Sequence, residues 1–137
     1  MFDVEAFTSG ALYFLLAFAI SGLFALGFKY VYQWITPHNE KRLIREGNSA
    51  AAVVLGGAII GYVIPLASAL SQTHSLPEFV AWALLAGAIQ IAVFWVVRQV
   101  ALRDVSARIE RGETATAIYL AAISVAVGVL NAACMTS

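Results

Sequence analysis

The sequence contains little charge, and what charge it has lies outside four long apolar runs. Only 12% of the 137 residues are charged, whereas 61% are hydrophobic and the mean hydropathy is +0.85. Soluble domains carry about 25% charged residues. A soluble helical bundle would also need a polar stripe on each helix, and windows such as ALYFLLAFAISGLFALGF have none. The composition therefore indicates a membrane protein.

Four stretches lack Asp, Glu, Lys and Arg and are long enough to cross a bilayer. They cover residues 6–28, 47–77, 79–97 and 114–137. A membrane-spanning helix needs about 20 predominantly apolar residues. We therefore expect an all-α membrane protein in which a single integral domain, residues 1–137, has four transmembrane helices.

Groups suited to catalysis or proton transport are also scarce. No charged residue or histidine lies deep in a predicted span, where proton-coupled transporters usually place ionisable groups. His38 and His74 fall on opposite sides of the predicted bilayer. The single cysteine, Cys134, has no cysteine to pair with and no histidine or acid beside it. We expect no enzymatic activity, no metal or other cofactor, and no nucleic-acid partner.

Basic residues are absent before the first apolar run, where Asp3 and Glu5 stand instead, so we do not expect a cleaved signal peptide. All eight basic residues flank two connections, the first and the third between spans. They are Lys29, Lys41, Arg42, Arg45, Arg98, Arg103, Arg108 and Arg111. The positive-inside rule puts both connections in the cytoplasm and both termini outside it.

One short sequence motif occurs twice in similar form. IREGNSAAA, residues 44–52, is followed 65 residues later by IERGETATA, residues 109–117. We interpret the chain as two tandem hairpins, repeat one about 9–71 and repeat two about 77–135. Each repeat has an even number of crossings, so we expect a pseudo-twofold axis along the membrane normal. Chance alignment of apolar segments is the alternative, and the shared order of charge, glycine and small residues favours duplication.

The charged connections, residues 40–48 and 103–113, are called the elbows below. Gly47 and Gly112 can adopt the left-handed conformation that ends a short interfacial helix. The next span can be capped by Asn48 or Ser49 in the first copy and by Glu113 or Thr114 in the second. The alternative is that each elbow binds an anionic headgroup, a ligand or a protein partner. The cations for that contact are Lys41, Arg42, Arg45, Arg108 and Arg111. The mixed signs in both elbows favour capping.

The segment REGNSAAA, the glycines at 56, 57 and 61, and the two tandem hairpins resemble the bacterial inner-membrane family catalogued as domain of unknown function 350. The resemblance covers roughly residues 9–133. It implies a small multi-pass protein of the bacterial inner membrane with no established activity, and it supplies no catalytic residue. The second copy has Glu113 in place of Asn48 and alanines in place of Gly56 and Gly57, so a role of those positions need not be duplicated.

Small residues predict how the spans pack. Gly57 and Gly61 form a GxxxG step, and Ala122 and Ala126 align with them in the last span. Because small residues let helix backbones approach in lipid, the second and fourth spans should form a tight centre. The aligned pair Gly22 and Gly87 marks the contact side of the first and third spans. A gating or pore-lining role is the alternative.

The spans contain few polar side chains. Pro65 cannot donate to the carbonyl of Gly61, so a kink or an unpaired acceptor is expected there. Gln90 is placed to reach that carbonyl or another subunit. We interpret Gln90, Ser124 and Asn131 as interhelical hydrogen-bonding groups, with substrate binding as the alternative.

Two functional hypotheses follow. The favoured one is a non-enzymatic structural or signalling subunit of the inner membrane, whose elbows contact membrane lipid or a cytoplasmic protein. The alternative is a small channel or passive transporter with a pore between subunits, lined by Ser21, Gln90, Ser124 and Asn131. Both hypotheses favour a homo-oligomer.

Overall fold

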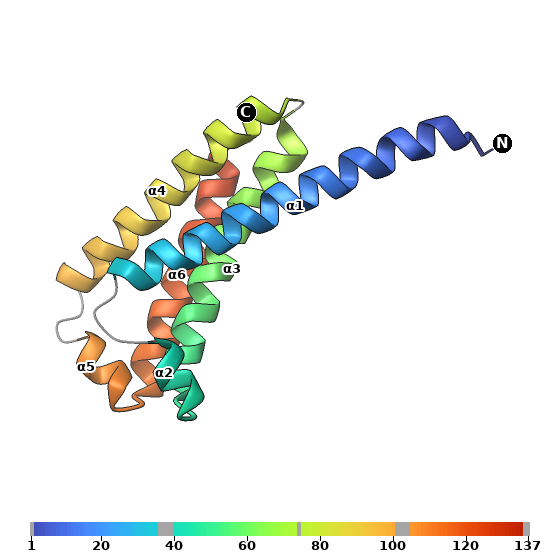
Figure 1. Cartoon of the computed structure of the whole chain (residues 1–137). Coiled ribbons are helices and arrows are strands. Elements are labelled where there is room, and N and C mark those ends of the chain that lie inside the picture. The colour runs from blue at the N-terminus through green and yellow to red at the C-terminus, as the bar shows by residue number, and fades with distance from the viewer. Residues whose placement is uncertain (1, 36–39, 74, 101–104, 136–137) are drawn as a thin grey trace.

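The computed structural model describes residues 2–35, 40–73, 75–100 and 105–135, and within them the chain forms six helices (Figure 1). These are α1 (Val4–Ile35), α2 (Glu40–Arg45), α3 (Ser49–Gln72), α4 (Leu76–Val100), α5 (Val105–Glu110) and α6 (Thr114–Met135). Among the described residues α1, α3, α4 and α6 are long and apolar enough to cross a membrane. The all-α membrane architecture with four transmembrane helices is confirmed.

Two helix ends differ from the expected spans. α1 continues to Ile35, well past Phe28, because a helix can extend through polar and aromatic residues at the membrane surface. α4 begins at Leu76, so Pro77 belongs to its first turn rather than to a loop. Proline suits that position because its missing N–H would have no helical acceptor there. The hydroxyl of Ser75 accepts a hydrogen bond from the Glu78 N–H, 3.3 Å away, at the start of this helix.

α3 is the central helix of the bundle. In the most apolar stretch of each long helix, 56% of the residues are buried in α3, compared with 22% in α4 and in α6 and 11% in α1. α3 and α6 lie side by side and run in the same direction, with α4 against them (Figure 1). The prediction that the second and fourth spans form the centre is therefore confirmed. α2 and α5 lie at one end of this pair.

α1 joins the bundle mainly through its C-terminal half. The ring of Phe28 stacks on that of Tyr62 with centroids 4.5 Å apart, and the ring of Tyr32 meets that of Phe94 at 4.8 Å. Residues 2–10 and 12–16 are exposed, and Figure 1 shows this half of α1 projecting away from the other helices. The N-terminal half of α1 therefore presents an apolar surface that its own chain does not cover.

Candidate functional site

Each elbow ends its short helix with a glycine in the left-handed conformation. φ is 87° at Gly47 and 77° at Gly112. In the first elbow the Asn48 N–H donates to the carbonyl of Leu43 at 2.8 Å, and the Gly47 N–H donates to that of Ile44 at 3.0 Å. This pair of bonds is a Schellman motif, in which glycine avoids the steric penalty that a Cβ would meet.

The second elbow repeats these hydrogen bonds. The Glu113 N–H donates to the carbonyl of Arg108 at 3.0 Å, and the Gly112 N–H donates to that of Ile109 at 2.9 Å. Donors and acceptors all lie 65 residues after their counterparts. The local geometry of the elbows is thus duplicated, and the twofold relation of the two whole hairpins stays a prediction.

Asn48 connects the two elbows. Its Oδ1 accepts a hydrogen bond from the Ala51 N–H at 3.0 Å, which caps α3. Its Nδ2 donates to the carbonyl of Ile109 in the other elbow at 2.8 Å, and the carbonyl of Glu110 is 3.4 Å away. Ile109 is completely buried, so the bond lies against a packed interior. The cross-elbow bond was not expected from the sequence, which indicated only the cap.

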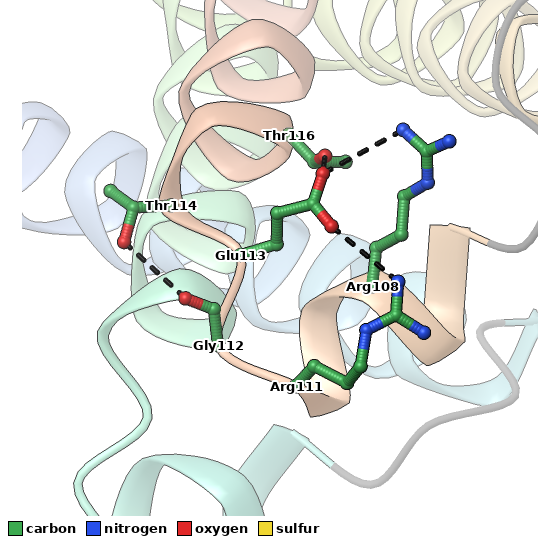
Figure 2. Close-up of polar contacts among 6 residues, drawn as sticks. All are labelled: Arg108, Arg111, Gly112, Glu113, Thr114 and Thr116. Carbon is green, nitrogen blue, oxygen red and sulfur yellow. Dashed lines mark hydrogen bonds and ion pairs between the residues drawn. The ribbon is translucent and has the colours of Figure 1, made fainter.

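Glu113, the counterpart of Asn48, binds cations instead (Figure 2). Its Oε1 accepts a hydrogen bond from the Thr116 hydroxyl at 2.5 Å and lies 3.6 Å from Nη1 of Arg108. Its Oε2 lies 3.5 Å from Nη2 of Arg111. The Thr116 hydroxyl, followed by the charges of the two arginines, lowers the pKa of the Glu113 carboxyl below its ordinary value of 4.5. Arg108 and Arg111 are thereby partly neutralised within their own elbow.

The other elbow cations are less constrained. Nε of Arg42 lies 3.9 Å from Oε1 of Glu46, and both side chains are more than half exposed. Arg45 is exposed, and the side chain of Lys41 lies outside the described part of the chain. Exposed ion pairs of this kind contribute about 0–1 kcal/mol. The Arg42–Glu46 pair therefore contributes little to stability, and both side chains are accessible at the elbow end of the bundle.

The centre of the bundle depends on glycines that leave no room for a side chain. A Cβ added to Gly57 would overlap Ala121, and one added to Gly61 would overlap the carbonyl group of Ser124. A Cβ on Gly128 would overlap the Gly61 carbonyl in the same way. α3 and α6 therefore approach to backbone contact, which small residues permit in lipid.

The packing residues on α6 differ from those expected. Ala122 and Ala126 are exposed and line a shallow outer hollow beside Gly57, whereas Ala121, Ser124 and Gly128 face α3. Ala122 and Ala126 thus lie at the edge of the α3–α6 contact, and α6 presents Ala121, Ser124 and Gly128 to α3. The four-residue spacing of Ser124 and Gly128 is the signal that sequence reasoning missed.

Gly22 and Gly87, which were expected to mark helix contacts, have different surroundings. Nothing of the described chain lies within 4 Å of a Cβ added to Gly22, so this residue does not mark a contact within the chain. A Cβ on Gly87 would lie 3.3 Å from the ring of Tyr62. Gly87 thus makes space for Tyr62, whose hydroxyl donates to the carbonyl of Ala83 at 2.9 Å. Sequence analysis did not single out Tyr62.

Gln90 and Asn131 tie α4 to α6. Nε2 of Gln90 donates to the carbonyl of Ser124 at 3.2 Å, and Nδ2 of Asn131 donates to that of Ala86 at 3.2 Å. Gln90, Asn131 and Ser124 are each at least nine-tenths buried. Gln90 therefore makes an interhelical bond, although not to the Gly61 carbonyl. Its Oε1 is buried and has no hydrogen-bond partner in the described structure.

Pro65 has no N–H to donate to the Gly61 carbonyl. Gly128 of α6 packs against this carbonyl instead. α3 continues through Pro65 as one helix. Because Gly128 has no side chain, its backbone lies directly against the Gly61 carbonyl oxygen. A Cα–H group can make a weak hydrogen bond to such an oxygen. α3 is thus not broken at Pro65, and the carbonyl that the proline leaves unpaired lies in the close contact between α3 and α6.

Metal-ligating and nucleophilic side chains are few among the described residues. These residues contain no group of three or more His, Cys, Asp and Glu side chains that could hold a metal ion. Cys134 is exposed near the end of α6. The notable features are therefore the joined elbows at one end and the buried polar contacts around α4.

Four apolar helices and two basic elbows define a small integral membrane protein. Residues 5–135 match the family described as Domain of Unknown Function (DUF350), and the chain belongs to that family. It is 40% identical over 124 residues to the UPF0719 inner membrane protein YjfL of Escherichia coli strain K12, a match that covers 86% of this chain and 93% of the relative. The protein of the same name from Escherichia coli O157:H7 is equally similar. No solved structure is significantly similar.

Proposed function

We propose that this inner-membrane protein is a non-enzymatic subunit whose elbow face binds anionic lipid headgroups and a cytoplasmic protein. The observation that supports the proposal is the joining of the elbows by the Asn48–Ile109 hydrogen bond, 2.8 Å long, which makes one surface of two charged segments. Side-chain exposure on this surface is 59% for Arg42, 40% for Arg108 and 65% for Arg111. The exposed parts of these side chains are accessible to lipid or to a protein partner.

The charge of this surface is moderate. A basic residue close to an anionic leaflet contributes about 1 kcal/mol to attraction. Glu113 offsets part of this for Arg108 and Arg111, and Glu46 does so for Arg42. We therefore expect binding that is reversible and weakened by salt. The positive-inside rule places the surface in the cytoplasm, with both termini on the other side.

The test replaces Lys41, Arg42, Arg108 and Arg111 by Gln in the full chain. Native mass spectrometry of the protein in nanodiscs rich in phosphatidylglycerol then counts bound anionic lipid, and crosslinking in cells detects protein neighbours of the elbows. The matched control is Lys29→Gln with Arg98→Gln, which removes basic groups from the ends of α1 and α4. We expect the elbow variant to lose lipid and neighbours. Unchanged lipid and unchanged neighbours in that variant contradict the proposal.

A pore between subunits has less support. Gln90 is 4% exposed, and Ser124 and Asn131 are each 8% exposed, because they lie between helices of one chain. A pore between subunits would have to be lined by outward-facing groups. The burial of these three residues therefore favours the binding subunit. Ion conduction by purified protein in liposomes would reverse this preference.

We further propose a homo-oligomer in which α1 contacts another copy. The supporting observation is the exposed apolar stretch of α1, with Phe14 65% and Phe18 70% exposed. Van der Waals packing between helices drives association in lipid. The test places a cysteine at Phe14 in a Cys134→Ser background and oxidises native membranes. We expect crosslinked dimers, which the control at exposed Val63 on α3 should not give; absence of dimers at both positions speaks against this contact.

A further inference from the structure

A small polar hollow lies at the end of the bundle opposite the elbows. It has a volume of about 210 Å³ and is bounded by the end of α3, the start of α4 and the end of α6. Its lining residues are Ala69, Gln72, Thr73, Glu78, Trp82 and Met135. The volume is far above the roughly 10–15 Å³ that one water needs. The hollow can therefore hold a small organic group.

The hollow carries an uncompensated negative charge. Glu78 is exposed, and no ion pair to it forms among the described residues. The sequence has no Lys or Arg between Arg45 and Arg98. Arg98 follows Glu78 on the same helix by 20 residues, or about 30 Å at the helical rise of 1.5 Å. No basic group of the described chain approaches the carboxylate, so a cation from outside is its complement.

Trp82 determines which kind of cation fits. It follows Glu78 by four residues, so both side chains lie on one face of α4. Trp82 is 37% exposed and forms part of the lining of the hollow. An indole face attracts organic ammonium groups, which also tolerate the apolar neighbours Ala69 and Met135. A hard metal ion would instead need about six or more oxygen ligands, and the described residues hold no such cluster.

Two further polar groups complete the lining. Gln72 is exposed and offers an amide oxygen as an acceptor. The hydroxyl of Thr73 donates to the carbonyl of Ala69 at 2.8 Å, so its oxygen remains able to accept. A primary ammonium group has N–H donors and no acceptor, which matches the acceptors on this side of the hollow. A quaternary ammonium group has no N–H, so its attraction would come from the Glu78 charge and the Trp82 ring alone.

We propose that this hollow binds a primary or quaternary ammonium group. The ligand is either the headgroup of a zwitterionic phospholipid such as phosphatidylethanolamine, or a small free amine. Trp82 lies near a helix end, the level at which tryptophan meets lipid headgroups. The hollow is at the other end of α3 from the elbows, so its role is independent of the proposed elbow binding.

The experiment uses the full chain in nanodiscs at pH 8, where an ordinary imidazole is neutral. In the lipid arm, native mass spectrometry compares bound phosphatidylethanolamine with phosphatidylglycerol from an equal mixture. In the free-amine arm, ethanolamine and tetramethylammonium are titrated calorimetrically into protein in phosphatidylglycerol alone. Wild-type protein is expected to select the ammonium ligand in at least one arm.

Variants identify the site. Glu78→Gln and Trp82→Leu should each weaken that selection about fivefold or more, while Trp82→Phe should retain part of it because an aromatic face remains. Glu5→Gln removes the same charge from α1 and should change nothing. Selection in the lipid arm assigns a headgroup, and selection in the free-amine arm assigns a soluble amine. Equal behaviour of wild-type and Glu78→Gln protein in both arms overturns the proposal.

Discussion

The side chain of Asn48 makes two hydrogen bonds that join different parts of the bundle. Its oxygen caps α3 through the Ala51 N–H at 3.0 Å, and its nitrogen reaches the carbonyl of Ile109 at 2.8 Å. One short side chain thus fixes a helix start and the contact between the elbows. Glu113, at the matching place in the second elbow, has no side-chain N–H to donate, and its carboxylate binds Arg108 and Arg111 instead.

Substitutions can separate the two roles of Asn48. Asn48→Ser keeps an oxygen for the cap and loses the amide that reaches Ile109, so we expect a loss of about 1 kcal/mol in unfolding free energy. Asn48→Ala loses both bonds and should lose about 2 kcal/mol. Unfolding of the protein in mixed detergent micelles measures both values. Wild-type stability of Asn48→Ser would show that the cross-elbow bond contributes nothing.

Close packing at Gly61 and Gly128 predicts a strong effect of a single methyl group. Gly61→Ala and Gly128→Ala should each destabilise the bundle by about 1–3 kcal/mol, because the new Cβ meets backbone atoms that cannot move aside. Gly56→Ala is the matched control in α3, since nothing lies within 4 Å of its added Cβ. The same unfolding measurement applies. A destabilisation by Gly56→Ala as large as that by Gly61→Ala would argue against the packing of α3 on α6.

Gln90 should tolerate replacement by leucine. Gln90→Leu loses one interhelical hydrogen bond, worth about 0.6 kcal/mol in membranes. It also removes the buried Oε1 that has no partner among the described residues, a group that costs about 1–3 kcal/mol when left unpaired. We expect unchanged or slightly higher stability, and a larger loss for Asn131→Leu. A loss above about 1 kcal/mol in Gln90→Leu would mean that Oε1 has a partner in the membrane.

The lowered pKa of Glu113 predicts acid sensitivity of the second elbow. The carboxyl has a lower pKa in the folded protein than in the unfolded chain, so the unfolded chain binds more protons in acid. The contribution of Glu113 to stability is therefore present above its ordinary pKa of 4.5 and is lost as pH falls through the lowered folded value. Wild-type unfolding midpoints followed from pH 7 to pH 3 should approach those of Glu113→Gln. A constant difference over this range contradicts the assignment.

The spans and the elbows could be predicted from sequence because each has a strong local signal. A run without charges indicates a membrane helix, and a glycine after a short charged helix indicates a left-handed end. Both signals operate within a few residues. They identified Gly47, Asn48, Gly112 and Glu113 at the positions where the structure turns.

The rotation of each helix about its axis could not be predicted in the same way. A helix that is apolar all round has no polar stripe to show which face is buried. For this reason Ala122 and Ala126 were expected at the centre, although Ala121 and Gly128 lie there. The bond of Tyr62 to Ala83 and that of Asn48 to Ile109 join residues from different helices, and no pattern along one helix encodes such a pair.

The sidedness of the elbows is tested most directly by cysteine labelling in a Cys134→Ser background. Glu46→Cys reports on the first elbow, and Ser75→Cys reports on the exposed connection between α3 and α4. A maleimide that cannot cross the inner membrane is applied to cells with a permeabilised outer membrane. Labelling at 75 from outside, and at 46 only after the inner membrane is opened, is the predicted result. Labelling of both positions from the same side would contradict the transmembrane bundle with its basic elbows at one cytoplasmic surface.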